Sequence, residues 1–249
     1  MVDVENKIAK TIANRAFRLD YETVYKLIDD RPFYLAGGAL CGDEVHDFDL
    51  YPVYGDPFDA AKIAAKITKT CEKDAVVVYK SPNALTVRLL AKNQVVQFCS
   101  YVKPTLEELV DSFDFSHIQV GIAFRGNGCA PFHEHVYYTD AFVLANVTRK
   151  TVYTGSEYPL SSLVRLFKYH KRGKLNKTET TQAVMKIVKD VVDRGYEDYK
   201  DYKNQLDAVD LGYPDMEEAW ELYKSFAAKN IVAHTLDDEK ARRKEGSSV

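Results

Sequence analysis

The sequence has few of the features that would place it in a specialised class of protein. Its four cysteines, Cys41, Cys71, Cys99 and Cys129, include no pair at metal-ligand or CxxC spacing, so we expect free thiols in a reducing cytosol. No apolar stretch approaches the length of a membrane span, and residues 1–20 lack the apolar core of a secretory signal. We therefore expect a cytoplasmic protein without membrane contacts.

An excess of positive charge is also missing. The 34 Lys and Arg residues are slightly outnumbered by 37 Asp and Glu residues, which gives a formal net charge of −3. A globally basic nucleic-acid binder is therefore excluded, and any contact with RNA or DNA has to come from a local patch. With 249 residues, of which 46% are hydrophobic, the chain can bury the core of one large domain or two small ones.

The order of the expected elements indicates an α+β protein, in which mixed elements come first and helices follow. Residues 133–153 are expected to form a hairpin strand and a short helix, and Asp56 is the expected N-cap of a helix that begins at Pro57. We expect a head with a mixed β-sheet over 1–155, a helical domain over 156–236 and a flexible tail over 237–249. Hydrophobic patterning predicts helices over 3–17, 21–29, 57–71, 103–110, 160–172, 179–194 and 214–230, and strands over 33–36, 48–54, 74–80, 84–90, 94–102 and 117–124.

The most informative pattern is an apolar strand that ends in Gly37-Gly38 and is followed by a strand that carries Asp47 and Asp49. Residues two apart on a strand point to the same face, so the two carboxylates lie side by side. Such carboxylates repel one another unless a cation lies between them, and Mg²⁺ is typically held by one or two carboxylates and substrate phosphates. Glycines let a phosphate chain approach the backbone. The pattern therefore predicts a metal-dependent nucleotide site.

This arrangement, in which Gly37-Gly38 and Asp47-Phe48-Asp49 are separated by eight residues, resembles the signature of the DNA polymerase β-type nucleotidyltransferase superfamily. It looks most like the branch that contains poly(A) polymerases and tRNA CCA-adding enzymes. The resemblance implies that Asp47 and Asp49 are catalytic and bind Mg²⁺ or Mn²⁺, and that Gly37 and Gly38 bracket the triphosphate of an NTP. The alternative is a tight turn followed by two solvent-facing aspartates.

One position departs from the superfamily pattern. The resemblance implies a third carboxylate on a strand beside the two aspartates, and the strand 94–102 carries Gln97 there. The nearest acidic substitute is Asp114, which we include among the catalytic candidates. The site has two aspartates only, or Asp114 completes it, or the protein is catalytically weak. The Asn-Ala at 83–84, the Gln-containing strand and the Phe-Asp block at 113–114 are also similar to viral and protist nucleotidyltransferase-like proteins. If the protein is viral, we expect it in the host cytoplasm.

A basic helix is expected just after the head. Arg165, Lys168 and Arg172 recur at helical spacing and are followed by Gly173. The segment resembles the neck helix of CCA-adding and bacterial poly(A) polymerases, which implies that these side chains bind nucleotide phosphates. The alternative is a solvated basic face that ends at a glycine cap. Lys80 and Arg88 lie on neighbouring strands and are further candidates for binding the triphosphate. The more common arrangement is that such residues face solvent on one side of the sheet.

Other polar residues give weaker signals. His133 and His135 could share a strand face as metal ligands, but no further Cys or His lies at a useful spacing, so a polar loop is favoured. His46 lies next to the aspartates and is interpreted as a loop residue. The sequence contains no clear copy of the base-selecting Glu-Asp-x-x-Arg motif of CCA-adding enzymes, so the choice of nucleotide stays open.

The function predicted from these observations is metal-dependent transfer of a nucleotidyl group from an NTP to an acceptor hydroxyl. An RNA 3′ end, including that of a tRNA, fits the resemblance to the neck helix. A protein hydroxyl, as in toxin-like members of the superfamily, fits the near-neutral charge. The alternative from another class is a nucleotide- or RNA-binding module that has lost catalysis, and Gln97 is the observation that favours it.

Overall fold

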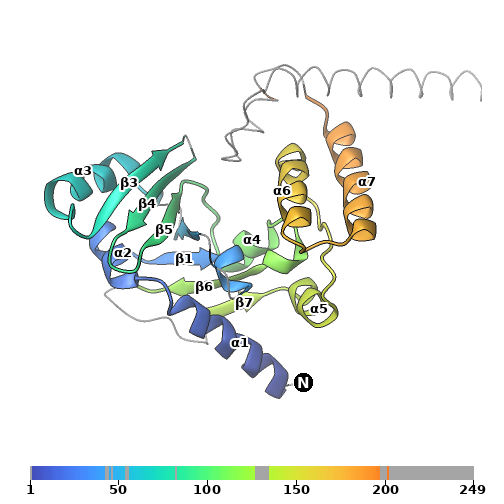
Figure 1. Cartoon of the computed structure of the whole chain (residues 1–249), viewed down its shortest axis with the longest axis horizontal. Helices are drawn as coiled ribbons and strands as arrows, with labels where there is room; N and C mark the ends of the chain where they lie inside the picture. The colour runs from blue at the N-terminus through green and yellow to red at the C-terminus, as the bar shows by residue number, and fades with distance from the viewer. Residues whose placement is uncertain are drawn as a thin grey trace, which may run out of the picture.

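A seven-stranded mixed sheet forms the body of the protein (Figure 1). The computed structural model describes residues 2–42, 45, 47–53, 56–81, 83–126, 135–196 and 201. The strand order is β3-β4-β5-β2-β1-β6-β7, in which β2 and β5 are parallel and every other neighbouring pair is antiparallel. The strands are β1 (Phe33–Ala36), β2 (Phe48–Pro52), β3 (Ala75–Lys80), β4 (Ala84–Leu89), β5 (Gln94–Cys99), β6 (Val120–Phe124) and β7 (Val136–Tyr138).

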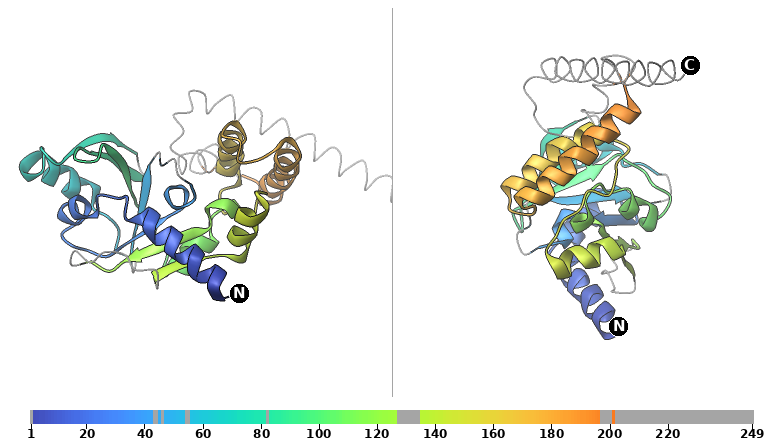
Figure 2. Two further views of the ribbon diagram at one scale, coloured as in Figure 1. Left: turned by 60° about the horizontal axis from the view of Figure 1, so that its bottom comes forward. Right: turned by 90° about the vertical axis from the view of Figure 1, so that its right-hand side faces the viewer.

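Helices cover the sheet unequally. α1, α2 and α3 pack on one face, α4 packs on the other, and α6 and α7 lie side by side away from the sheet (Figures 1 and 2). The predicted α+β class, with a mixed-sheet head followed by helices, is confirmed. The α-helices are α1 (Val2–Ala16), α2 (Tyr21–Leu27), α3 (Ala60–Thr70), α4 (Leu106–Asp111), α5 (Asp140–Thr148), α6 (Pro159–Lys171) and α7 (Lys177–Arg194), and two 3-10 turns are η1 (Gly38–Leu40) and η2 (Ser116–Ile118).

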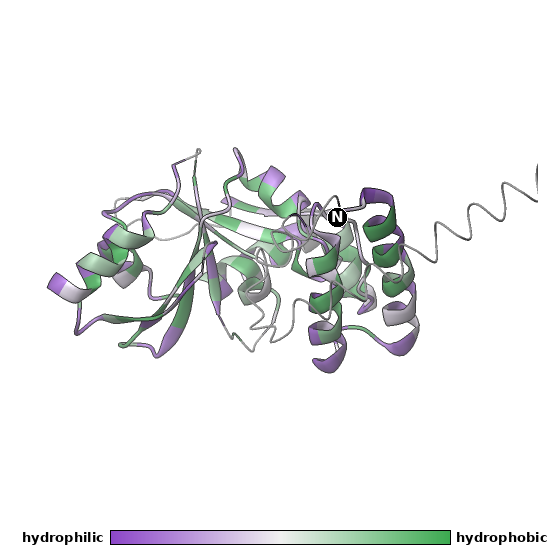
Figure 3. Ribbon diagram, turned by 90° about the horizontal axis from the view of Figure 1, so that it is seen from above, coloured by the Kyte–Doolittle hydropathy of each residue, from purple (hydrophilic) through white to green (hydrophobic). Residues whose placement is uncertain are grey.

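The main core lies between the sheet and α1–α3. Phe33 stacks on Phe124 with ring centroids 4.4 Å apart, and Phe58 meets Phe98 edge to face. On β2 the buried positions alternate with half-buried ones, as expected for a strand with one face in this core. Hydrophobic segments run along the strands, and hydrophilic ones gather at loops and helix ends (Figure 3). The alternation leaves every second residue of β2 on the other face.

On that other face, α4 lies directly against β6. A Cβ atom added at Gly121 would come within 2.7 Å of Leu106 and 2.9 Å of Val110, so only a glycine lets α4 approach this closely. Leu106 and Val110 join Tyr34 and Ala36 of β1 in a second cluster. This cluster covers the β1–β6 part of the face.

A third cluster joins the sheet to the helices α6 and α7. Phe115 pairs with Tyr153 in an isolated β-bridge and packs with Leu166 and Ile187. The buried Gln119 holds the same segment, because its amide donates to the Phe113 carbonyl at 2.9 Å. The expected division of the chain at 155/156 stays a prediction, since residues on both sides of it share this cluster.

Some boundaries differ from those expected. The helix expected from Pro57 begins at Ala60, because Asp59 rather than Asp56 caps it, with its carboxylate accepting from the Lys62 amide at 2.9 Å. Asp56 instead forms an ion pair with Arg31 at 2.6 Å. The expected helix over 214–230 and the tail over 237–249 lie outside the described residues. None of the described helices has the length and apolar character needed to cross a membrane.

Candidate nucleotide and metal site

The Gly-Gly turn follows β1 and depends on glycine at its first position. Gly37 has φ +84° and ψ −140°, which side-chain-bearing residues rarely adopt. Its amide donates to the Val120 carbonyl at 2.9 Å, so the turn is tied to β6. Gly38 is exposed, and a Cβ added there would meet nothing within 4 Å. The two glycines thus make a fixed turn with an open outer side, which a phosphate chain can approach.

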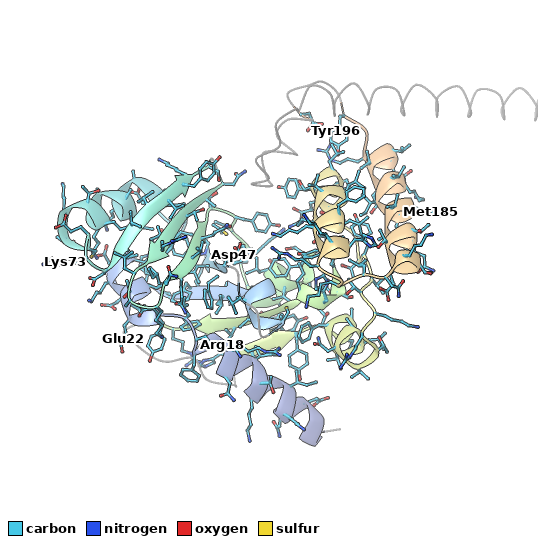
Figure 4. All side chains as sticks on the ribbon, viewed as in Figure 1. Arg18, Glu22, Asp47, Lys73, Met185 and Tyr196 are labelled. Carbon is cyan, nitrogen blue, oxygen red and sulfur yellow. The ribbon has the colours of Figure 1, made fainter. Side chains whose placement is uncertain are left out.

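The two aspartates lie beside this turn. Asp49 pairs with Ala36 of β1, the residue that precedes Gly37, and Asp47 comes just before β2. Both carboxylates are half-buried, whereas Phe48 between them is buried in the main core. In Figure 4, Asp47 lies on the side of the sheet toward α6. The structure therefore brings Gly37, Gly38, Asp47 and Asp49 together, as the spacing predicted.

The electrostatics of the aspartate pair favour a cation. Burial raises the pKa of the Asp49 carboxyl to about 7, and the charge of Asp47 adds to the rise, while Lys168 and Arg165 lower it. Within the described residues, neither carboxylate accepts a hydrogen bond or forms an ion pair. Two neighbouring carboxylates without partners in a half-buried position are costly unless a positive ion compensates them.

The donor set fits Mg²⁺ or Mn²⁺, because both ions prefer oxygen ligands and Mg²⁺ is commonly held by one or two carboxylates and phosphates. Asp47 and Asp49 would hold the ion. Among the described residues, no group of three or more His, Cys, Asp or Glu side chains is placed to hold a metal. A third acidic ligand is therefore not supplied by any described residue.

Gln97 occupies the position next to Asp49 on the neighbouring strand. The parallel register of β2 and β5 pairs Asp49 with Gln97 directly, which is the position that the superfamily resemblance implies for a third acid. Paired residues of adjacent strands project to the same face, so the Gln97 amide is directed to the same side as the Asp49 carboxylate. The departure seen in the sequence thus falls within the site itself.

The helix α6 brings positive charge toward the aspartates. The charges of both Arg165 and Lys168 act on Asp49. Lys168 is exposed, and no described residue forms an ion pair with it. Arg172 is exposed just beyond the last residue of α6, and its charge is not among those that act on Asp49. Lys168 is therefore the basic residue of the helix best placed for a phosphate.

Asp114 does not lie beside Asp47 and Asp49, where a third catalytic acid was expected. Its side chain is 1% exposed and forms an ion pair with Arg165 at 2.8 Å. Its carbonyl accepts from the Thr154 amide at 2.9 Å, which ties it to the junction with the helices. The structure does not group Asp114 with the two aspartates. It places Asp114 behind Arg165, where it fixes the guanidinium.

The structure also separates Lys80 from the site. The β3–β4 register pairs Lys80 with Leu85, whose side chain is in the main core, so Lys80 belongs to the face opposite Asp49. Arg88 pairs with Val95 and is exposed on the same face as Gln97. His46, Asp43, Glu44 and His133 lie outside the described residues.

Two basic residues near the Gly-Gly turn were missed by the sequence reasoning. The Lys174 ammonium lies 3.9 Å from the Cβ position of Gly42, in the loop after η1. Arg15 of α1 donates to the Leu40 carbonyl at 2.9 Å, within η1 itself. Lys174 directly follows the glycine that ends α6, which was a usable signal, whereas nothing local to Arg15 indicates its position.

A cavity of about 460 Å³ lies elsewhere, between α2 and α3, and its lining includes Asp29, Lys66 and Asp74. Its charges are compensated within the protein, since Asp29 forms ion pairs with Lys62 at 2.8 Å and with Lys66. Hydrogen bonds from Lys62 and Lys66 lower the pKa of Asp29 to about 2. Asp29 in this cavity therefore differs from Asp47 and Asp49, which have no ion-pair partner among the described residues.

Comparisons with known proteins point to one family and to several solved structures. A family model described as the Gabija anti-defense 2 family protein matches residues 3–149. No curated protein matches the chain. Similar solved structures include the Thermotoga maritima CCA-adding enzyme complexed with tRNA, which is 13% identical with a TM-score of 0.46, the alignment covering 80% of this chain and 50% of that one.

Two further structures have the same kind of similarity. A CCA-adding enzyme in complex with CTP is 15% identical, with a TM-score of 0.46 and coverage of 76% of this chain and 46% of that one. A tRNA nucleotidyltransferase complexed with a primer tRNA and an incoming ATP analogue is 15% identical, with a TM-score of 0.41 and coverage of 82% and 60%. The chain thus spans about half the length of the CCA-adding enzymes that it matches.

Proposed function

This chain belongs to the Gabija anti-defense 2 family, and we propose that it is a metal-dependent nucleotidyltransferase that moves an NMP from an NTP to an acceptor hydroxyl. The observation that carries the proposal is the pair Asp47 and Asp49, two adjacent carboxylates with which no described residue forms a hydrogen bond or an ion pair. They lie beside a glycine turn open to a phosphate chain and opposite the positive charges of α6. This is the charge pattern that a metal-bound triphosphate requires.

Each part of the site has a role in this proposal. Asp47 and Asp49 would hold Mg²⁺ or Mn²⁺, which would neutralise charge on the triphosphate. Gly37 and Gly38 leave the backbone open beside the phosphates. Lys168 binds a phosphate as a point charge. Arg165 contributes positive charge and is held in place by Asp114.

The reaction would proceed by positioning and charge neutralisation. The acceptor oxygen forms a bond to the α-phosphorus, the bond from that phosphorus to the bridging oxygen breaks, and pyrophosphate leaves. The proton of the acceptor hydroxyl passes to solvent. No residue of this chain forms a covalent intermediate in this scheme.

We propose an RNA 3′ end, such as that of a tRNA, as the acceptor. The basic residues Lys168, Arg172 and Lys174, at the end of α6 and just beyond it, are all exposed and supply the local positive patch that a near-neutral chain needs for RNA. The family description names an action against a defence called Gabija. Transfer to an RNA that this defence requires would be one way to produce such an action, and a protein acceptor is a competing outcome of the test below.

A second candidate function is a nucleotide-binding module without catalysis. The specific observation that favours it is the neutral side chain of Gln97 directly opposite Asp49. In this reading the site binds a metal-bound nucleotide and does not transfer it. Both candidate functions require binding of a metal-bound NTP, but only the first transfers the nucleotidyl group to an acceptor.

The deciding experiment incubates the purified chain with Mg²⁺, each α-labelled NTP in turn, and a pool of small RNAs. Label transferred to RNA by the wild type and lost in Asp47→Ala/Asp49→Ala would support the proposal, and label on protein would reassign the acceptor. Asp193→Ala, which removes an exposed carboxylate paired with Lys189, is the matched control and should transfer normally. Mg²⁺-dependent NTP binding without transfer would support the second candidate.

A further inference from the structure

The metal site differs from a two-ion site in one respect, which is the side chain beside Asp49. Gln97 is paired with Asp49 across β2 and β5, and Thr86 is its partner on β4. Thr86, Gln97 and Asp49 are therefore neighbours across β4, β5 and β2, and only Asp49 carries a carboxylate. Within the described residues, the Gln97 side-chain amide makes no hydrogen bond, so it is not committed to another structural role.

The carboxylates that the described residues bring to the site match the charge of one divalent ion. Asp47 and Asp49 together carry two negative charges, which a single Mg²⁺ balances. The amide oxygen of Gln97 can act as a ligand, but it adds no charge. Two ions lying about 4 Å apart, as in two-metal sites, repel strongly and need additional anionic ligands to be held together.

The described residues around the aspartates do not provide that additional negative charge. Arg165 and Lys168 bring positive charge from α6. Asp114, the acid that the sequence offered as a third ligand, is buried and forms an ion pair with Arg165. Among the described residues, no third acid, histidine or cysteine joins Asp47 and Asp49. A second divalent ion would thus lie among cations without a protein carboxylate of its own.

We propose that this site binds one divalent cation per bound nucleotide, held by Asp47, Asp49 and the phosphates, and that Gln97 is the residue that limits the number to one. The inference rests on the proposed nucleotide site and specifies its metal content. An acid at position 97 would place the missing charge beside Asp49, because the strand register already directs that side chain to the same face. We therefore expect Gln97→Glu to create a second ion site.

The test counts ions and nucleotides together. Equilibrium dialysis with Mn²⁺ and the non-hydrolysable α,β-methylene analogues of ATP, CTP, GTP and UTP, one at a time, gives both the Mn²⁺ and the nucleotide bound per chain. The variants are Gln97→Glu and Gln97→Asp. Val95→Glu is the matched control, since it adds a carboxylate to the same face of β5 two residues away. Asp47→Ala/Asp49→Ala serves as the variant without metal ligands.

The expected result is one Mn²⁺ per bound nucleotide in the wild type and in Val95→Glu, and two in at least one of the position-97 variants. Two Mn²⁺ per nucleotide in the wild type would overturn the proposal while leaving the proposed nucleotide site intact. One Mn²⁺ in well-folded Gln97→Glu and Gln97→Asp would overturn the role of Gln97. Failure of the wild type to bind Mn²⁺ with any analogue would instead overturn the proposed function.

Discussion

Two half-buried or buried acidic positions of this protein have opposite environments. At the start of β2, Asp47 and Asp49 lie next to one another with no ion-pair partner among the described residues. At the junction with the helices, Asp114 is 1% exposed and is paired with Arg165 at 2.8 Å. The first pair has no ion-pair partner among the described residues, whereas the charge of Asp114 is balanced by Arg165. The difference distinguishes two neighbouring carboxylates that are open to a ligand from one that is engaged by a neighbouring guanidinium.

The largest effect is expected from removing the unpartnered pair. Asp47→Ala/Asp49→Ala should reduce nucleotidyl transfer by on the order of 10³-fold or more, which corresponds to about 4 kcal/mol of transition-state stabilisation. The same variant should unfold at an equal or higher temperature in the presence of a chelator, because two mutually repelling carboxylates are removed. Transfer assays and thermal unfolding measure the two effects. A large loss of stability would contradict the view that these residues bind rather than hold the fold.

At the junction with the helices, we expect a substitution of Asp114 to reduce the stability of the fold. Asp114→Ala leaves the Arg165 guanidinium without its partner, and because that side chain is 32% exposed, the loss should cost about 1–3 kcal/mol. Urea denaturation measures this loss. The double variant Asp114→Leu/Arg165→Met, which removes both charges, should be more stable than Asp114→Ala. If Asp114→Ala were as stable as the wild type and lost only activity, Asp114 would be a member of the site after all.

A pH effect is expected from His117, which also belongs to the junction and packs edge to face on Tyr169 at 4.5 Å. Burial lowers the pKa of His117 to about 4, and the charge of Lys174 adds to this, so the folded protein holds the neutral ring. The unfolded chain, with an ordinary pKa near 6.5, binds more protons between these values. Stability is therefore fully present above about pH 6.5 and falls by on the order of 3 kcal/mol as the pH drops toward 4.

Urea denaturation at several pH values measures this contribution as the difference between the wild type and His117→Phe. The variant should lose less stability than the wild type between pH 6.5 and 4. His170→Gln, which alters an exposed histidine of α6 that contacts Thr180, is the control and should follow the wild type. Parallel curves for the wild type and His117→Phe would show that His117 is solvated.

The smallest effect is expected from Lys168, whose charge acts on Asp49 at the candidate nucleotide site. Lys168→Ala should weaken binding of a metal-bound NTP by about tenfold, equal to about 1.4 kcal/mol, and should leave folding unchanged because no described residue pairs with it. The loss should shrink at high salt, since the interaction is between exposed charges. Lys171→Ala, on the same helix, is the matched control. Equal effects of the two substitutions would indicate a diffuse basic surface instead of a phosphate contact at Lys168.

The comparison also shows which inferences local sequence could support. The alternation of strand side chains correctly placed Asp47 and Asp49 together, and the Gly-Gly turn correctly ended the preceding strand. The N-cap of α3 was misplaced by three residues, because Asp56 and Asp59 are equally good caps locally and the burial of Phe58 decides between them. Lys80 was expected at the triphosphate, but its pairing with Leu85 puts it on the opposite face.

The sequence by itself determined the α+β class, the glycine turn and the neighbouring aspartates, since each follows from residue type and a short periodicity. Tertiary structure decided that Asp114 is paired with Arg165, that Lys174 and Arg15 flank the Gly-Gly turn, and that Gln97 lies directly opposite Asp49. These placements join residues from about 25 to about 130 positions apart. They depend on how strands and helices pack as a whole, and no local pattern of side chains contains that information.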